Sequence, residues 1–118
     1  MTIAGIIGKI KQTKPHAYND DVIVSFVNML EQQVQTNVIQ TEDRVTYQLP
    51  ADADTPLLID GAFESCYLFF VCAMIDLNQQ EMVSYDHNMG LFNALWDEYT
   101  KWYVRTHEKE STQITNFW

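Results

Sequence analysis

Three histidines are the side chains in this chain best suited to binding a metal or moving a proton. His16, His87 and His107 lie far apart in the sequence. None belongs to a Glu-x-x-His or His-x-x-x-His pair, the spacing that puts two metal ligands on one face of a helix. We therefore expect no metal centre at these positions, and we interpret each ring as a solvated or capping side chain.

Two groups of carboxylates match parts of known sites without the rest. Asp52-Ala53-Asp54 begins like a calcium loop, yet Pro56 stands at the next ligand position and no glycine at the sixth. Asp76 and Glu81 could form a catalytic carboxylate pair, but no histidine or glycine loop accompanies them in the sequence. We interpret Asp76 as a hydrogen-bond acceptor and Glu81 as a favourable charge at a helix N-terminus.

The sequence indicates neither a nucleophile nor a phosphate loop. Gly5-Ile6-Ile7-Gly8 lacks the lysine of a phosphate loop, and no serine lies in a glycine-flanked elbow. Cys66 and Cys72 stand six positions apart in an apolar helical block, where they face different sides, cannot bridge each other and serve packing. We expect no enzyme and no cofactor.

The charge balance argues against nucleic acid and membrane as direct partners. Sixteen acidic and seven basic residues give a net charge of −9, which repels phosphate and anionic lipid over about 8–10 Å. The apolar block 66–75 is about half the length that crosses a bilayer, and the start of the chain does not resemble a secretory signal. We expect a chain made in a reducing cytoplasm.

Helical periodicity predicts a single domain, residues 1–118, built from about four helices. Apolar residues recur at helical spacing in the stretches 3–10, 23–38, 66–75 and 82–103. The third stretch is apolar on nearly every side and belongs at the centre of a bundle. A short turn near 78–80 makes the last two helices antiparallel neighbours. The predicted class is all-α, a small bundle with a long C-terminal helical hairpin.

The segment 40–60 departs from this helical pattern. Val45, Tyr47 and Leu49 alternate with polar residues, as in a short strand. One strand cannot satisfy its own hydrogen-bond ladder, so it needs a partner, either in a hairpin or in a neighbouring subunit. We predict an extended arm or β-hairpin there.

The segment 106–118 is predicted to be a polar C-terminal tail. Its apolar residues come late, at Ile114, Phe117 and Trp118. We expect it to become ordered by docking its terminal aromatics on a partner, with folding back onto its own bundle as the alternative.

A scattered set of residues resembles a known family. The set is Tyr67, Ala73, Ile75-Asp76, Glu81, Tyr85, Phe92-Asn93, Trp102-Tyr103 and Arg105. It resembles small helical proteins from the head-morphogenesis region of long-tailed bacteriophages of Gram-positive hosts, grouped as head-tail connector, adaptor or head-completion proteins. The stretch 14–18 is similar to their Lys-Pro-Asn-x-Tyr turn, whereas Asp86-His87 replaces their Asn-Asn and Gln80 replaces a glycine.

The resemblance implies a non-enzymatic adaptor in the virion neck, made in the host bacterial cytoplasm. It implies a homo-oligomeric ring, twelve-fold, that binds the portal protein above and a neck, stopper or tail-completion protein below. DNA would only pass through the channel. A different class remains open, a small bacterial accessory or regulatory subunit that binds another protein as a monomer or dimer.

Within this interpretation two sets of residues are candidate sites. The candidate contacts with the portal or a neighbouring subunit are Val45, Tyr47, Leu49, Ile114, Phe117 and Trp118. The candidate channel-facing acids are Glu42, Asp43, Asp52 and Asp54. A negative wall would repel phosphate and let DNA slide without sticking.

Overall fold

The structure, a computed structural model, describes residues 1–14, 18–40, 46–59 and 61–115, with side chains as far as His107. Its elements are α1 (Ile3–Thr13), α2 (Asp20–Gln33), the π-helix η1 (Val34–Ile39), the 3₁₀ turn η2 (Gly61–Phe63), α3 (Ser65–Asn78) and α4 (Met82–Thr115). The described residues contain four α-helices and no strand, which confirms the predicted all-α class.

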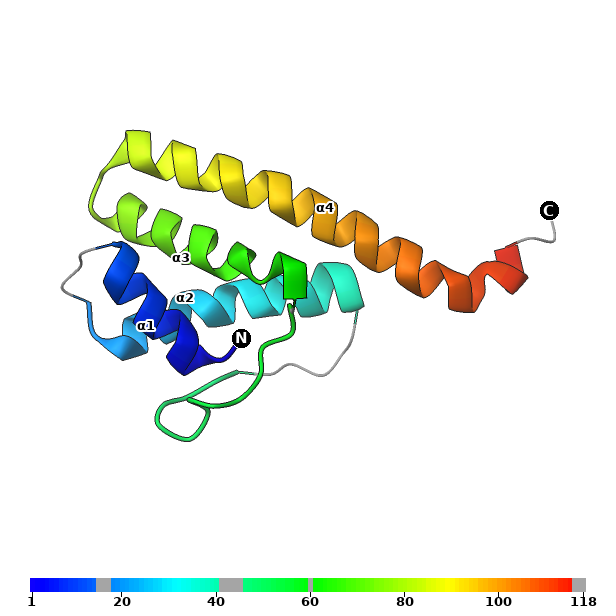
Figure 1. The fold of residues 1–118 in the computed structure, drawn as a ribbon, viewed down its shortest axis with the longest axis horizontal. Helices are drawn as coiled ribbons and strands as arrows, with labels where there is room; N and C mark the ends of the chain where they lie inside the picture. Colours follow the sequence, from blue (N-terminus) through cyan, green and yellow to red (C-terminus); the bar gives the residue numbers. More distant parts are fainter. Residues whose placement is uncertain (15–17, 41–45, 60, 116–118) are drawn as a thin grey trace.

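The central helix is α3. It is antiparallel to α4, and α1 and α2 lie on its other side (Figure 1). Its buried apolar side chains are Cys66, Tyr67, Phe70, Val71, Cys72, Ala73 and Ile75. Burial raises the pKa of the Cys66 thiol to about 12, as expected of a packing residue. An apolar stretch with no polar face can be accommodated only where other elements enclose it.

The first two helices begin where side chains cap them. Thr2 Oγ1 accepts a hydrogen bond from the Gly5 N–H at 3.1 Å, and Asn19 Oδ1 accepts one from the Val22 N–H at 3.1 Å. Each cap satisfies a backbone donor that the first helical turn leaves free. The buried face of α1 consists of Ile3, Ile6, Ile7 and Ile10, as its spacing predicts.

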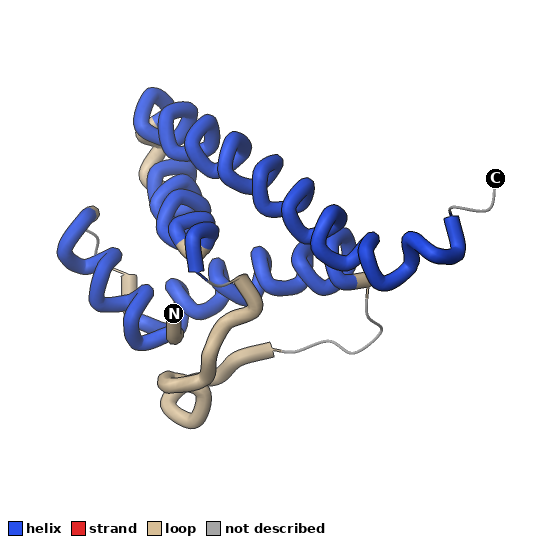
Figure 2. The backbone as a smooth tube through the Cα atoms, turned by 45° about the vertical axis from the view of Figure 1, so that its right-hand side comes forward, coloured by secondary structure: helices blue, strands red, loops and turns tan. Residues whose placement is uncertain are grey.

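The last helix is longer than predicted. α4 continues through Thr115, so the expected polar tail from residue 106 is wrong for 106–115. Local contacts one helical turn apart favour the extension: the Thr106 hydroxyl donates to the Trp102 carbonyl, and the His107 ring stacks on Tyr103 with centroids 3.8 Å apart. α4 therefore projects past the other helices, and its described end at Thr115 lies away from them (Figures 1 and 2).

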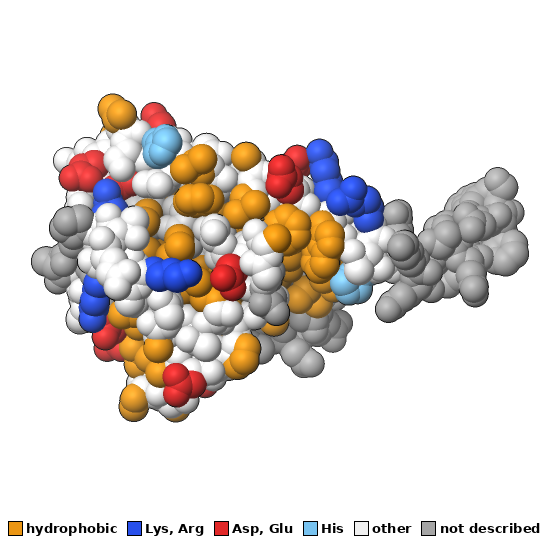
Figure 3. All heavy atoms as spheres, in the orientation of Figure 1, with side chains coloured by type: hydrophobic (Ala, Val, Ile, Leu, Met, Phe, Trp, Pro, Cys, Tyr) orange, Lys and Arg blue, Asp and Glu red, His pale blue; other side chains and the backbone are white. Residues whose placement is uncertain are grey.

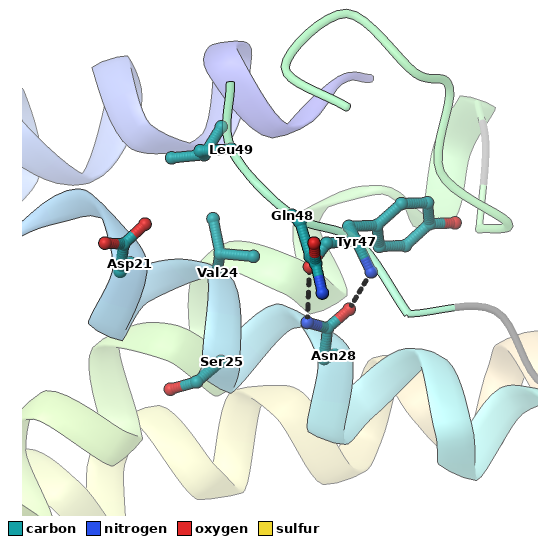
Figure 4. Close-up of a pocket in the computed structure, with 7 residues that line it drawn as sticks. All are labelled: Asp21, Val24, Ser25, Asn28, Tyr47, Gln48 and Leu49. Carbon is teal, nitrogen blue, oxygen red and sulfur yellow. Dashed lines mark hydrogen bonds between the residues drawn. The ribbon is translucent and has the colours of Figure 1, made fainter. Parts of the chain in front are cut away.

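The described part of the arm, 46–59, is irregular and fastened to its own subunit. The Asn28 amide donates to the Tyr47 carbonyl at 3.1 Å and accepts from the Tyr47 N–H at 2.9 Å, so one side chain of α2 takes the place of a partner strand (Figure 4). The Tyr47 side chain is buried in the core. The expectation that Tyr47 contacts a neighbouring subunit is therefore corrected.

The turn between α3 and α4 is joined to the end of α1 through a buried acid. Asp76 is fully buried and ion-paired with Lys14, whose ammonium also lies 3.3 Å from Glu81. Ser84 and Asn88 of α4 each donate to Asp76 Oδ2 at 2.8 Å. Asp76 thus joins α1, α3 and α4, and its predicted role as a hydrogen-bond acceptor is confirmed.

We predict that Lys14→Met destabilises the fold by about 3–5 kcal/mol, because it leaves the Asp76 carboxylate buried without its cation. Urea unfolding near neutral pH measures the loss. The control is Lys11→Met, which removes an exposed pair with Asp20 and should cost less than about 1 kcal/mol. Equal losses in the two variants would contradict the role given to Lys14.

Candidate interaction site

Aromatic rings form a continuous row along the inner face of α4. Neighbouring centroids lie 5.3 Å apart for Phe70 and Phe92, 5.6 Å for Phe92 and Trp96, and 5.9 Å for Trp96 and Tyr99. These separations are typical of favourable aromatic pairs, each worth about 0.5–1.5 kcal/mol beyond burial. The apolar residues predicted at helical spacing in 82–103 therefore lie largely in the core, where they pack on α3.

The row reaches the surface at Trp102, where it forms a groove. The Phe63 ring of η2 contacts Tyr99 and Trp102, each with centroids 5.5 Å apart. The resulting groove of about 320 Å³ is lined by Gly61, Ala62, Phe63 and Trp102, and we call it the aromatic groove. Trp102 keeps 41% of its surface exposed, although it packs on a ring of the core. Tryptophan and phenylalanine are among the residue types enriched at protein interfaces.

Further apolar side chains are exposed at both ends of α4. Val104 is 52% exposed on the later part of α4, where it lines a separate pocket with Val38 and Ile39 of η1, and Val83 is 88% exposed at the start of α4. Figure 3 shows apolar side chains gathered on this face next to the described end of α4, with Lys and Arg at the border. An apolar centre with a polar rim is typical of protein interfaces.

A carboxylate inside the core holds the arm in place. Glu31 is fully buried and accepts hydrogen bonds from the Tyr67 hydroxyl, from the Tyr47 hydroxyl at 2.8 Å and from the Leu58 N–H at 3.0 Å. The Tyr67 hydroxyl in turn accepts from the Ile59 N–H at 2.8 Å. Both ends of the described arm are therefore fixed by one side chain of α2.

Burial has the largest effect on the pKa of Glu31. Desolvation raises the pKa of Glu31 above its ordinary 4.5 and outweighs the hydrogen bonds from Tyr67, Leu58 and Tyr47, which lower it. At Asp76 desolvation also raises the pKa, but the hydrogen bonds from Lys14, Ser84 and Asn88 and the charge of Lys14 lower it further, to below 3.8. The Lys14 cation beside Asp76 distinguishes this acid from Glu31, whose hydrogen-bond donors are all neutral.

The structure places the predicted contact residues in different surroundings. Tyr47 is core, and Leu49 is partly buried at a shallow pocket between α2 and the arm (Figure 4). That pocket, of about 320 Å³, is lined by Asp21, Val24, Ser25, Asn28, Tyr47, Gln48 and Leu49. Ile114 lies on α4 but beyond the described side chains. Val45, Phe117 and Trp118 lie outside the described residues.

The predicted channel-facing acids also lie in different surroundings. Asp52 accepts from the Gln48 N–H at 2.8 Å and so organises the turn of the arm. Asp54 is exposed in the same turn, whereas Glu42 and Asp43 lie outside the described residues. Of the four predicted channel-facing acids, two lie within the described residues, and of these two only Asp54 has an exposed carboxylate as the prediction requires.

Two residues important to the site escaped the sequence prediction. Glu31 lies four positions after Val27 on the buried face of α2, so its place in the helical period was the available signal. Trp102 lies beside the apolar residues predicted at helical spacing, and only the position of η2 makes it part of a groove.

Metal and membrane signals are weak in this structure. Within 1–14, 18–40, 46–59 and the described side chains from 61 on, no three His, Cys, Asp or Glu residues are grouped to hold a metal ion. The segment Gly61–Asn78 meets the length and composition criteria for a membrane span, and half of it is buried inside the structure. The core helix of a soluble protein meets the same criteria.

Comparisons with known proteins found no matching family model, no matching curated protein and no matching solved structure.

We predict that Glu31→Ala destabilises the fold by about 3 kcal/mol or more, because the two tyrosine hydroxyls and the Leu58 N–H lose their buried acceptor. Urea unfolding measures the loss, and Gln32→Ala on the exposed side of α2 is the control, expected within about 0.5 kcal/mol of the parent.

The same carboxylate gives a pH test with a defined sign. Because the folded pKa of Glu31 is raised, its contribution is complete below about pH 4.5 and is lost as the pH rises through the folded pKa. Glu31→Gln should therefore lose less stability than the parent as the pH rises above about 4.5. Parallel pH profiles for the two proteins would refute this assignment.

Proposed function

We propose that this chain is a non-enzymatic head-tail connector, or adaptor, of a bacteriophage neck. It forms a homo-oligomeric ring, twelve-fold by family resemblance, that lies beneath the portal protein and above a stopper or tail-completion protein. DNA passes through the channel of the ring without being held. The protein is made in the bacterial host and ends in the virion neck.

The observation that carries the proposal is the division of α4 into two parts. Its first part packs on α3, whereas its later part exposes Trp102 and Val104 and then projects past the other helices (Figure 1). A projecting helix gains little from its own subunit, since most helical stability comes from packing an apolar face. Repeated contacts between identical subunits, or with a portal, would supply that packing.

The charge of the chain agrees with a passive channel. A net charge of −9 disfavours lasting contact with DNA phosphates, while permitting close passage of a duplex. The resemblance in the residues from Tyr67 to Arg105 points to the same class. The alternative, an accessory subunit that binds one protein partner as a monomer or dimer, fits the exposed groove but gives no role to the projecting helix.

The mass of the assembly separates the two functions. We predict that the full chain, alone or mixed with a portal protein of the same phage, forms a large ring visible by electron microscopy and native mass spectrometry. Val104→Glu should weaken assembly at least about tenfold, because the interface would bury a charge in place of an apolar side chain. Gln12→Glu on the exposed side of α1 is the control. A parent protein that stays a monomer or dimer even with portal overturns the proposal.

The channel charge generates a second prediction. The triple variant Glu42→Lys, Asp43→Lys and Asp54→Lys should slow DNA ejection or trap DNA in the neck, because lysines bind phosphate and release counterions. Ejection from variant virions measures the rate. A matched triple change of exposed acids elsewhere, Asp21, Asp86 and Glu98 to lysine, is the control. Equal rates in both variants would remove the channel assignment.

A further inference from the structure

The aromatic groove combines large and small lining residues. Two large rings, Phe63 and Trp102, line it together with the small residues Gly61 and Ala62. Its volume of about 320 Å³ lies at the low end of ligand pockets, which range over about 300–1,000 Å³. Such a groove suits a single anchor from a protein better than a folded surface.

The chain itself contains a matching anchor beyond its last helix. Phe117 and Trp118 follow closely after the end of α4 at Thr115. Aromatic side chains are the residue types most often found as anchors at interfaces, and they pack favourably on other rings. The sequence from 116 to 118 therefore has the chemistry that the groove would bind.

The length of α4 separates this anchor from the groove of its own subunit. At about 1.5 Å per residue, α4 carries the chain about 20 Å from Trp102 to Thr115, directed away from the other helices. The remaining residues span at most roughly 11 Å when fully extended. Even a chain that turned back along α4 would stop short of Phe63, because Phe63 contacts the level of Tyr99 and Trp102.

We propose that the aromatic groove of one subunit binds one terminal aromatic side chain, that of Trp118, from a second copy of the chain. This is a heterologous contact, since two different surfaces meet, and such contacts generate rings when the rotation closes. The inference rests on the proposed connector function, which it deepens by naming the surfaces through which neighbouring subunits are joined.

The experiment locates the anchor directly. The photo-crosslinking residue p-benzoylphenylalanine replaces Trp118 in the full chain, and equal amounts of ¹⁵N-labelled and unlabelled protein are mixed and irradiated. The expected product is a cross-link from position 118 to the peptide containing Gly61–Phe63 or Trp102, with mixed isotopes that prove an intermolecular contact. Cross-links within one copy, cross-links to another surface, or no cross-links overturn the inference.

A groove-filling variant provides the second measurement. Ala62→Trp leaves the core side chains in place but occupies the groove, so the cross-link yield should fall at least about tenfold. Ala94→Trp, an equal change at an exposed position on the middle of α4, should leave the yield unchanged. Equal yields in both variants would also overturn the inference.

The outcomes also distinguish this inference from the proposed function. Rings that assemble while position 118 cross-links elsewhere would refute the groove contact and leave the connector function intact. The expected cross-link in a species that never exceeds a dimer, with or without portal, would support the groove contact and refute the connector function.

Discussion

The hydrogen bonds to the buried carboxylate of Glu31 determine how the irregular part of this chain lies against its helices. The described arm from 46 to 59 contains no named strand, but its backbone pairs with the N-terminus: the Ala4 N–H donates to the Ala53 carbonyl at 2.9 Å and the Leu57 N–H donates to the Met1 carbonyl at 3.0 Å. Glu31 fixes Tyr47 at one end and Leu58 at the other, and its contact with Tyr67 ties both to the central helix. Asn28, one turn earlier on α2, pairs the backbone of Tyr47. A buried polar network of this kind specifies one arrangement because every alternative leaves donors unpaired.

Two buried acids hold the two ends of the central helix α3, and different partners compensate the cost of burying each one. Near its start, Tyr67 donates to Glu31, which has only neutral donors around it. Near its end, Asp76 has a cation, Lys14, together with two donors from α4. Burial penalises both carboxylates, but at Asp76 the hydrogen bonds from Lys14, Ser84 and Asn88, together with the Lys14 charge, outweigh it and lower the pKa. The two ends of α3 therefore respond in opposite directions to a change of pH.

Much of the fold follows from the sequence, because apolar spacing reports which face of a helix is buried. The buried face of α1 and the enclosed position of α3 are both predicted correctly. The arm is predicted as an extended arm or a hairpin, but its partner is not predicted, because alternation at Tyr47 cannot say whether a strand or the Asn28 side chain pairs with its backbone. The helical end of α4 is not predicted, because a polar stretch has no apolar periodicity by which a helix could be recognised. The aromatic groove depends on η2 meeting Trp102 from a distant part of the sequence, and local patterns contain no such information.

The buried rings and the exposed side chains of α4 occupy separate sections of the helix. The core can therefore be complete while the surface proposed for assembly stays exposed. The inner rings of α4, from Phe92 to Tyr99, complete the core with α3 and contribute roughly 1.5–3 kcal/mol for each fully buried side chain. Trp102 and Val104 lie after this section and contribute little to it, since each keeps about half of its surface exposed. Changes at the groove should therefore alter contacts between proteins without unfolding the subunit, whereas changes at Glu31 or Asp76 act on the subunit itself. The surface proposed for assembly is consequently the exposed part of α4, which the packing of its first part on α3 holds in position.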